Sequence, residues 1–287
     1  MTEKNTVPQI DLDKVFKEKN PRLYKFLPSF VIGIIKKLIH QNDLNYLLKH
    51  GKGLKGVEFS DFVLNEMKVK LKFKGLENIP ANGNIILASN HPLGGIDGIA
   101  IVSMMGKIRR DLKFIVNDIL YQIPNYEGIF IPVNKHGVNS KSSLEAIENI
   151  YASQDAVLIF PAGFCSRKIR GKIMDINWNK SFITKSVKYN RDIVPVLINA
   201  QNGSFFYNLA TFRKWIGLKI NIEMMLLPHE MFKQRGKTIE IIIGKPVPHI
   251  AFKTGKSQHW ADMLRKFIYE LKNKPEADFL NFIHKNI

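Results

Sequence analysis

Five short apolar segments without polar alternation recur through the middle of the chain. Their positions are 85–88, 113–116, 129–133, 156–160 and 193–198. Such runs are typical of strands that are buried on both faces, as in a largely parallel sheet. Helical patterns separate them, for example the apolar series Leu144, Ile147 and Tyr151. Because strands and helices alternate, we predict an α/β fold in which helices flank a central sheet.

Further elements are expected on either side of these five segments. Residues 68–74 alternate lysine with apolar side chains, which predicts a strand with one face in water. Two more strands are expected at 219–226 and 238–243, and a helix is expected at 258–272. The sheet is therefore predicted to continue almost to the end of the chain and to be followed by one C-terminal helix.

The first 66 residues have a helical pattern. Ser29 and Asp43 are candidate caps of two helices. The first helix has an apolar stripe next to Lys36 and Lys37, which suits either a membrane surface or packing on the next domain. The stripe consists of Phe30, Val31, Ile34, Ile35, Leu38 and Ile39. We expect an N-terminal helical, membrane-proximal subdomain (1–66), an α/β domain (67–255) and a C-terminal helix (256–287).

Composition and charge restrict the class of protein and its partners. The chain has 43 Lys and Arg residues against 25 Asp and Glu residues, a formal net charge of +18. This excess favours nucleic acid, an anionic membrane or an acidic substrate as a partner, with a solvated basic surface as the alternative. No segment approaches the roughly 20 apolar residues that span a bilayer, and the first 20 residues are polar. We therefore expect neither a transmembrane helix nor a signal peptide.

A histidine and an aspartate follow the first of the five apolar segments. His91 lies just after it, and Asp97 opens the next helical pattern behind Gly94 and Gly95. In α/β sheets, functional residues gather where strands end. If Asp97 accepts from one imidazole nitrogen, the other nitrogen of His91 can act as a base. A loop histidine and a helix N-cap aspartate are the alternative interpretations.

A second candidate site follows the segment at 156–160. The turn from Pro161 to Gly163 is expected to present backbone N–H groups that can hold an oxyanion or a phosphate. The cations that follow suit an acidic group, with a solvated basic turn as the alternative. They are Arg167, Lys168, Arg170 and Lys172.

Together these segments resemble the glycerolipid acyltransferases, a family typified by bacterial enzymes that acylate lysophosphatidic acid. The family has four ordered sequence blocks, and this chain has a counterpart of each in the same order. They are Asn90-His91…Asp97, residues 128–133, Phe160-Pro161-Ala162-Gly163…Ser166, and Val194-Pro195-Val196. The first and third blocks are similar to a haemolysin-like bacterial branch, which includes O-acyltransferases that complete amino-acid lipids.

The chain departs from the family pattern at two positions. Five residues separate His91 from Asp97, where the family usually has four. Ala162 stands where the third block usually has a glutamate, which in the family belongs to the site for the glycerol-phosphate acceptor. The second departure predicts an acceptor other than glycerol 3-phosphate or its monoacyl form.

The resemblance implies a glycerolipid-acyltransferase-like α/β fold and an acyl transfer reaction. An acyl chain would move from a thioester of acyl carrier protein or coenzyme A to a hydroxyl of a lyso-lipid. His91 would act as the general base with Asp97 as its partner, and neither a metal nor a cofactor besides the acyl donor is expected. The residues expected to contact substrates are Asn90, Phe160, Pro161, Gly163, Ser166, Arg167 and Lys168.

The resemblance also implies where the protein acts and with what. Both substrates are amphiphilic, so the expected partners are a membrane surface, a lyso-lipid acceptor and acyl carrier protein, and not nucleic acid. The expected location is cytoplasmic, with peripheral attachment to the inner face of the cytoplasmic membrane. The apolar stripe of the N-terminal helices provides a means of attachment that does not span the bilayer.

Two other classes of protein fit part of the sequence. A Cys/His thioesterase or hydrolase would use Cys165, because nearby cations stabilise a thiolate, although a small buried thiol is the commoner role. A basic nucleic-acid-binding protein would fit the net charge, but the basic residues are dispersed and no binding module is recognisable. The single cysteine also excludes an intrachain disulfide and a zinc site made of several thiolates.

Overall fold

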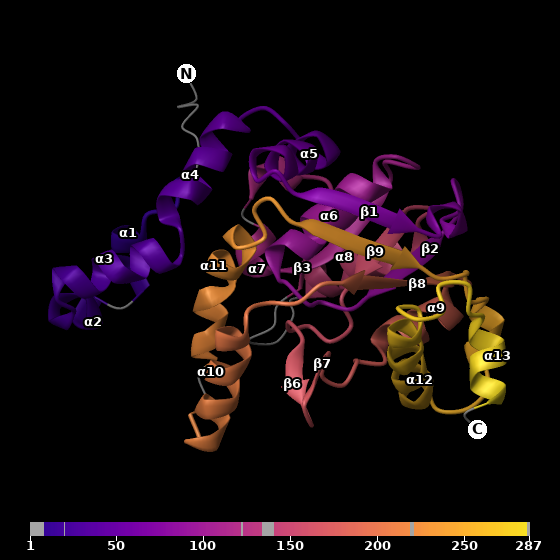
Figure 1. The fold of residues 1–287 in the computed structure, drawn as a ribbon. Helices are drawn as coiled ribbons and strands as arrows, with labels where there is room; N and C mark the ends of the chain where they lie inside the picture. Colours follow the sequence, from indigo (N-terminus) through magenta and orange to yellow (C-terminus); the bar gives the residue numbers. More distant parts are fainter. Residues whose placement is uncertain (1–8, 20, 122, 134–140, 219–220, 286–287) are drawn as a thin grey trace.

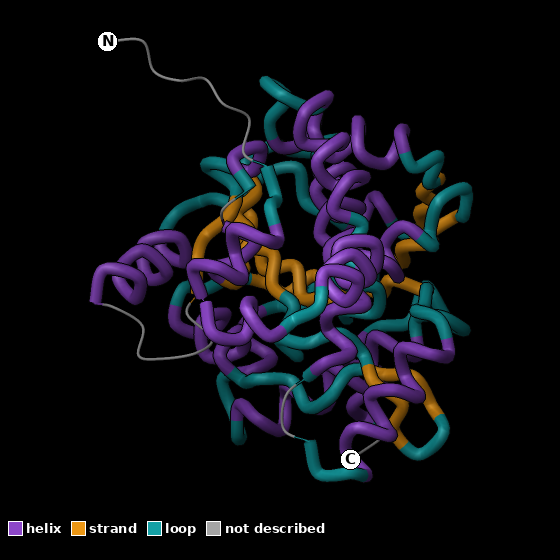
Figure 2. Tube along the Cα trace, turned by 90° about the vertical axis from the view of Figure 1, so that its left-hand side faces the viewer, coloured by secondary structure: helices purple, strands orange, loops and turns teal. Residues whose placement is uncertain are grey.

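The computed structural model of the protein describes residues 9–19, 21–121, 123–133, 141–218 and 221–285 (Figure 1). A seven-stranded sheet lies in the middle, with helices on either side (Figure 2). In spatial order the strands are β1 (Lys70–Lys74), β9 (Thr238–Ile243), β8 (Asp192–Asn199), β2 (Ile85–Ser89), β5 (Ala156–Ile159), β3 (Leu112–Asn117) and β4 (Phe130–Val133). The strands from β8 to β4 are parallel, whereas β9 is antiparallel to β8 and parallel to β1.

The helices precede, interleave with and follow these strands. Before the sheet lie α1 (Leu12–Lys19), α2 (Pro21–Phe26), α3 (Ser29–Leu38), α4 (Gln41–His50) and α5 (Gly56–Glu66). Between strands lie η1 (Leu76–Asn78), α6 (Gly95–Met105), α7 (Asp118–Tyr121), η2 (Pro124–Tyr126), α8 (Lys141–Ala152), α9 (Ser181–Lys188), α10 (Ser204–Trp215), η3 (Ile222–Leu226) and α11 (Leu227–Phe232), where η marks a 3-10 helix. After the sheet lie η4 (His249–Phe252), α12 (Ser257–Glu270) and α13 (Phe279–His284). A separate hairpin consists of β6 (Arg167–Ile169) and β7 (Lys172–Met174).

Successive residues of the central strands point into two hydrophobic layers on opposite faces of the sheet. On β2, Leu87 belongs to the layer that includes α5 and α6, whereas Ile86 and Ala88 belong to the layer that includes α9, α12 and α13. Side chains alternate across a strand, so a strand covered on both faces is apolar at every position. This is why the five central segments lack polar alternation. Since α5 packs on α6, it is part of this core.

The predicted strands are confirmed except for the one at 219–226. Residues 219–220 lie outside the described residues, and the remainder forms the 3-10 helix η3. Glu223 in this helix is buried and pairs with Arg167 and Arg213. These ion pairs hold the segment against α10, so it does not lie along an edge of the sheet.

The helices differ from the prediction in four places. Ser29 is the first residue of α3 and not its cap, and α4 begins before Asp43. Asp97 lies in the first turn of α6, which begins at Gly95, so it is not the N-cap. The C-terminal region has two helices, α12 and α13, where the sequence predicts one.

The N-terminal helices α1 to α4 extend away from the sheet (Figure 1). A histidine contact fastens them to α11: His40 Nε2 lies 2.9 Å from His229 Nδ1, and the His40 ring stacks on Phe232 with a centroid distance of 4.7 Å. Within the described ranges, no helix has the length and apolar character needed to cross a membrane.

A buried arginine stabilises the edge of the sheet at which the parallel strands begin. The guanidinium of Arg191, next to β8, donates to the backbone carbonyls of Ile85, Ile150, Tyr151, Ser153 and Asp155. Two of these carbonyls belong to the last turn of α8, where unpaired C=O groups carry partial negative charge. One side chain therefore connects β2, the end of α8 and the loop before β5.

We expect Arg191→Met to lower the free energy of unfolding by more than about 3 kcal/mol, because it leaves several buried carbonyls without a donor. Urea unfolding measures this change. The matched control is Arg110→Met, which removes an exposed ion pair with Glu58 and should cost less than about 1 kcal/mol. Equal losses in the two variants would contradict the role given to Arg191.

Candidate active site

The strands β8, β2 and β5 are adjacent and parallel, so they end at the same edge of the sheet. β2 leads into Asn90 and His91, and β5 leads into Phe160. The loops that follow these strands meet: the N–H of Ser166 donates to the carbonyl of His91 over 2.8 Å. The fold thus brings together the two motifs that the sequence singles out.

His91 and Asp97 form a hydrogen-bonded pair. His91 Nδ1 lies 2.9 Å from Asp97 Oδ2, and the same oxygen accepts from the N–H groups of Leu93 (2.8 Å) and Gly94 (3.0 Å). Gly94 has a φ of 94°, a backbone conformation that favours glycine. The glycine turn therefore accommodates the longer spacing between His91 and Asp97, and the pair remains intact.

The surroundings of the pair decide its protonation. Burial lowers the pKa of His91, but contacts with Cys165 and with the Asp97 carboxylate raise it, and the net direction is upward. Burial raises the pKa of Asp97, although its hydrogen bonds oppose this. The imidazole also stacks on Phe160 with a centroid distance of 4.2 Å. The ring is thus fixed with Nδ1 toward the carboxylate, which leaves Nε2 as the nitrogen that can accept a proton.

A second buried carboxylate, Asp175, holds the backbone of the site. Its Oδ1 accepts from the His91 N–H (3.2 Å) and from Ser166 Oγ (2.6 Å), and its Oδ2 accepts from Trp178 Nε1 (2.9 Å). The Asp175 N–H in turn donates to the hydroxyl of Tyr269 on α12 (2.8 Å). Asp175 therefore connects both motifs with the helical layer that contains α12.

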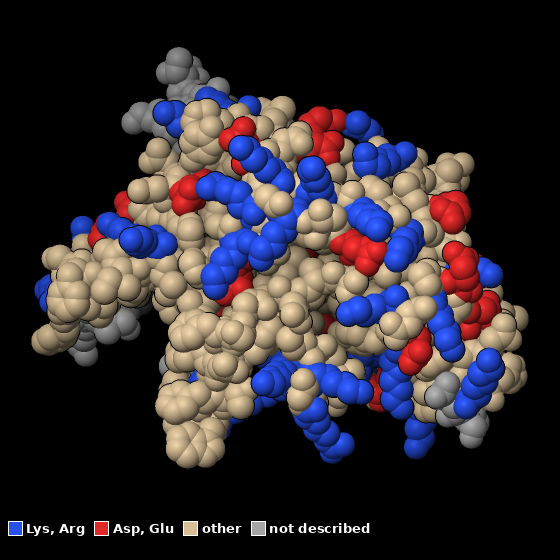
Figure 3. Space-filling model, viewed as in Figure 1, with Lys and Arg blue, Asp and Glu red and all other residues tan. Residues whose placement is uncertain are grey.

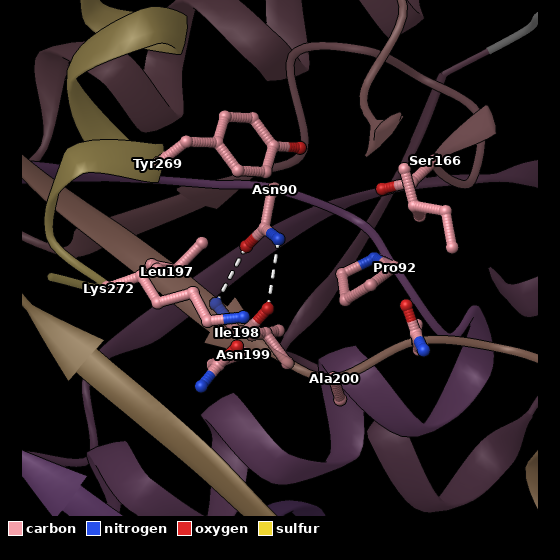
Figure 4. A pocket seen from close by; sticks show the side chains of 11 residues that line it. Asn90, Pro92, Ser166, Leu197, Ile198, Asn199, Ala200, Tyr269 and Lys272 are labelled. Atoms are coloured by element: carbon pink, nitrogen blue, oxygen red, sulfur yellow. Dashed lines mark hydrogen bonds between the residues drawn. The ribbon is translucent and has the colours of Figure 1, made fainter. Parts of the chain in front are cut away.

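A cavity of about 380 Å³ opens beside the His91 loop (Figure 4). Its lining includes Asn90 and Pro92, which flank His91, together with Ser166, the end of β8, Tyr269 and Lys272. Asn90 clamps the loop to β8, because its amide accepts from the Ile198 N–H (2.7 Å) and donates to the Ile198 carbonyl (3.0 Å). Both ends of this amide are thus used within the protein.

Residues of the third block have different environments. The N–H of Gly163 donates to the Phe160 carbonyl over 2.9 Å, so it is engaged in the turn. Pro161 is buried, and its carbonyl accepts from Asn179 over 3.0 Å. Phe160 lies against the imidazole, and Ser166 is bonded to Asp175. Of these four residues, Ser166 lines the cavity, and Phe160 contacts the His91 ring.

The four cations of the third block do not form one cluster. Arg167 is buried, donates to the Cys165 carbonyl (2.9 Å) and pairs with Glu223 (3.0 Å), which Arg213 also contacts. Its guanidinium is therefore used inside the protein, contrary to the expectation that it contacts an anionic substrate. Lys168, Arg170 and Lys172 are exposed on the β6–β7 hairpin.

Sequence reasoning missed three residues that organise the site: Asp175, Glu223 and Tyr269. A signal existed for the two acids, because Asp175 is the only acidic residue between Asp155 and Asp192, and none lies between Asp192 and Glu223. An isolated carboxylate in a long basic stretch indicates a buried hydrogen-bonding role. Tyr269 has no such local signal. Across the part of the chain that the structure describes, no group of three or more His, Cys, Asp or Glu side chains is arranged to hold a metal ion.

Comparison with known proteins gives three results. The family model described as "Acyltransferase" matches residues 14–278. A lyso-glycine lipid O-acyltransferase of Phocaeicola vulgatus is 40% identical over 91% of this chain and 95% of its own length, and one of Bacteroides thetaiotaomicron is 39% identical over 91% and 97%. The crystal structure of PlsC, the 1-acyl-sn-glycerophosphate acyltransferase from Thermotoga maritima, aligns with a TM-score of 0.46 and 18% identity, over 85% of this chain and 92% of that chain.

The family match and the two relatives each extend over most of the chain, including the His91–Asp97 pair and the segments that meet around it. The chain therefore belongs to the acyltransferase family, and the protein is an enzyme that transfers acyl groups.

Proposed function

We propose that the enzyme moves a fatty acyl chain from a thioester of acyl carrier protein or coenzyme A to a hydroxyl of a lyso-amino-acid lipid. The observation that carries this proposal is the His91–Asp97 pair at the carboxyl edge of the sheet. A general base must hold its proton-accepting atom ready for the substrate, and a buried carboxylate on Nδ1 fixes the ring for that purpose.

The proposed reaction uses both nitrogens of His91. Nε2 takes the proton of the acceptor hydroxyl while its oxygen bonds to the thioester carbonyl carbon. The C–S bond then breaks, and the departing thiolate recovers the proton from the imidazolium. Asp97 stabilises the imidazolium between the two steps without taking the proton itself. The products are an ester and a free thiol.

Asp175 acts in this proposal as a positioning residue. It touches the His91 backbone and the Ser166 hydroxyl, but it is fully buried beneath them. Because three donors converge on its carboxylate, the two loops keep a fixed separation. A displacement of about 1 Å at a reacting group can cost on the order of 10²-fold in rate, so this separation matters for catalysis.

Two features support a lyso-amino-acid lipid as the acceptor. The curated relatives, with about the same length, are lyso-glycine lipid O-acyltransferases. Ala162 is buried within a hydrophobic layer and offers a methyl group where the resembled family usually has a carboxylate for glycerol phosphate. We therefore propose a lyso-glycine lipid as the first acceptor to test.

The proposal includes peripheral attachment to the inner face of the cytoplasmic membrane through α3. Phe30 and Ile34 are exposed one turn apart on this helix, whereas Leu38 packs beside Cys165 in a small hydrophobic cluster. The stripe is thus divided between an outward and an inward part. Lys36 pairs with Asp13, so only Lys37 of the two lysines is exposed for lipid head groups.

Because the chain belongs to the acyltransferase family, we propose acyl transfer and neither of the two alternative functions, the Cys165 hydrolase and the nucleic-acid-binding protein. Cys165 is buried beside His91, where it contributes to packing. Its substitution therefore gives a control for the role of the histidine.

We expect His91→Ala to lower kcat by about 10²- to 10⁴-fold, because the general base is removed. Transfer from acyl carrier protein or coenzyme A thioesters to lyso-glycine lipid, followed by mass spectrometry, measures this. Cys165→Ser should keep more than half of the wild-type rate. If His91→Ala also keeps more than half of the wild-type rate, the mechanism is wrong. If an acylated Cys165 is trapped in the wild type, the thioesterase hypothesis is supported instead.

The same mechanism predicts a pH dependence. A raised pKa keeps His91 protonated at neutral pH, and only the neutral ring accepts a proton, so kcat/KM should rise with pH above 7. Cys165 and Asp97 both raise this pKa, and Asp97→Asn removes the contribution of the carboxylate. Its rising limb should therefore move to lower pH by about 1 unit or more, with a lower plateau. An unchanged limb in that variant would contradict the pairing.

We expect Asp175→Asn to lower kcat by about 10- to 100-fold with little change in KM, because an amide donor replaces one of the accepting oxygens and displaces the His91 loop. Asp192→Asn is the matched control, since Asp192 accepts from His249 at a partly exposed position away from the site. A variant of Asp175 that loses only thermal stability, with wild-type kcat, would reduce this residue to a structural role.

Acceptor choice can be tested by competition. Lyso-glycine lipid and lysophosphatidic acid are offered together in detergent micelles, and the products are counted by mass spectrometry. We expect lyso-glycine lipid to be the preferred acceptor. A clear preference for lysophosphatidic acid would overturn the proposed acceptor and leave the acyl transfer reaction in place.

A further inference from the structure

Helix α10 projects from the body of the protein and exposes large apolar side chains (Figure 1). Trp215 is 81% exposed, Phe205 is 61% exposed and Phe212 is 55% exposed. Trp215 and Phe212 lie together at the free end of the helix, with a ring centroid distance of 5.9 Å. Ile216 follows them and is exposed as well. A contiguous apolar tip of this kind marks a site of protein or membrane interaction.

The helix is held firmly enough to present this tip. Its other face buries Ala210, and it buries Phe206 and Tyr207 in a cluster that includes Cys165. Near the tip, Arg213 is buried and pairs with Glu223, which also pairs with Arg167 on β6. The exposed aromatic side chains therefore extend from a helix whose inner face is fixed by packing and by ion pairs.

The surface beside α10 is rich in cations, whereas Glu223 and Glu230, which contact this helix, are buried and paired with cations. No Asp or Glu occurs in the sequence from 193 to 222 or from 156 to 174. The β6–β7 hairpin packs beside α10 and exposes Lys168, Arg170 and Lys172, and Lys214 is exposed on α10 itself. Figure 3 shows the blue side chains of this region next to the tan surface of α10.

We propose that the tip of α10 inserts into the interface of an anionic membrane while the β6–β7 hairpin lies against the lipid head groups. Tryptophan and phenylalanine favour the interface of a bilayer, and nearby cations are attracted to anionic lipid. Nucleic acid would satisfy the cations but would leave the aromatic and aliphatic tip in water. The inference rests on the proposed function in one respect, that the substrates are lipids.

This contact is distinct from that of α3, although the two helices share a hydrophobic cluster. Leu38 at the end of α3 and Leu209 on α10 pack on the same cluster, whose buried members include Cys165. Cys165 in turn contacts His91. Two membrane contacts that are joined through this cluster would hold His91 at a fixed distance from the lipid surface.

Tryptophan fluorescence tests the insertion directly. The chain has three tryptophans, and Trp178 and Trp260 are buried, so Trp215 is the one whose environment changes on binding. With vesicles of phosphatidylcholine and phosphatidylglycerol, we expect a blue shift of emission, protection from acrylamide and quenching by lipids brominated along the acyl chain. Trp215→Phe should bind the same vesicles without these changes. Vesicle binding by the wild type without a shift and without quenching would overturn the proposal.

A variant pair separates the tip from general apolar exposure. Phe212→Asp/Trp215→Asp should weaken vesicle sedimentation by about ten-fold or more, because apolar area no longer leaves water. The matched control is Ile250→Asp on η4, which changes an exposed isoleucine outside α10 and should bind as the wild type does. Equal binding by the double variant and the wild type would overturn the proposal, once circular dichroism shows the variant to be folded.

Activity in detergent micelles distinguishes failure of this inference from failure of the proposed function. If the tip acts only in membrane docking, the double variant should keep the wild-type kcat with dispersed lyso-glycine lipid and lose rate only with vesicle-bound substrate. Equal loss in micelles and vesicles would overturn the docking role. If the wild type transfers no acyl group to lyso-glycine lipid in micelles, the proposed acceptor is wrong. The fluorescence measurement would still test whether the tip of α10 inserts into the membrane.

Discussion

The carboxylate of Asp175 receives hydrogen bonds from the His91 backbone, the Ser166 hydroxyl and the Trp178 indole. These donors come from the loop after β2, the segment after β5 and the turn before α9. Two adjacent parallel strands bring their ends close together, but they leave the conformation of the loops undecided. A buried carboxylate decides it, because each donor that is removed from water must find an acceptor. The position of the His91 ring therefore depends on Asp175, which bonds to the backbone of His91 and not to its imidazole.

Other buried charged side chains in the molecule also bond to several partners each. Arg191 has backbone carbonyls as its partners, and it joins the end of α8 to the beginning of the sheet. Glu223 is shared by Arg167 and Arg213, and it fixes η3 and α10 against the β6–β7 hairpin. In a chain with a net charge of +18, buried carboxylates are scarce, and each one organises several cations or donors.

The geometry of the pair explains how the longer spacing between His91 and Asp97 is compatible with their hydrogen bond. Asp97 lies in the first turn of α6, and its Oδ2 accepts from two backbone N–H groups as well as from His91. The turn that supplies those N–H groups contains Gly94 with a positive φ. An additional residue in this turn changes the path of the loop without moving its two ends apart. The departure at Ala162 differs, because it places a buried methyl group where the resembled family usually has a carboxylate.

The sequence by itself determined the α/β class, the central strands and the His91–Asp97 pair. Strands covered on both faces must be apolar throughout, and the residues of a motif at a strand end are close together along the chain. Both features can therefore be recognised in the sequence alone. Tertiary structure alone decided the roles of Arg167, Tyr269 and η3. The sequence favours Arg167 as an anion-binding residue, whereas in the structure it pairs with Glu223, 56 positions away. Apolar residues on α3 and α10 look alike in sequence as well. Only packing shows that Leu38 and Phe206 face inward while Phe30 and Trp215 face the solvent, because burial depends on neighbours that are distant along the chain.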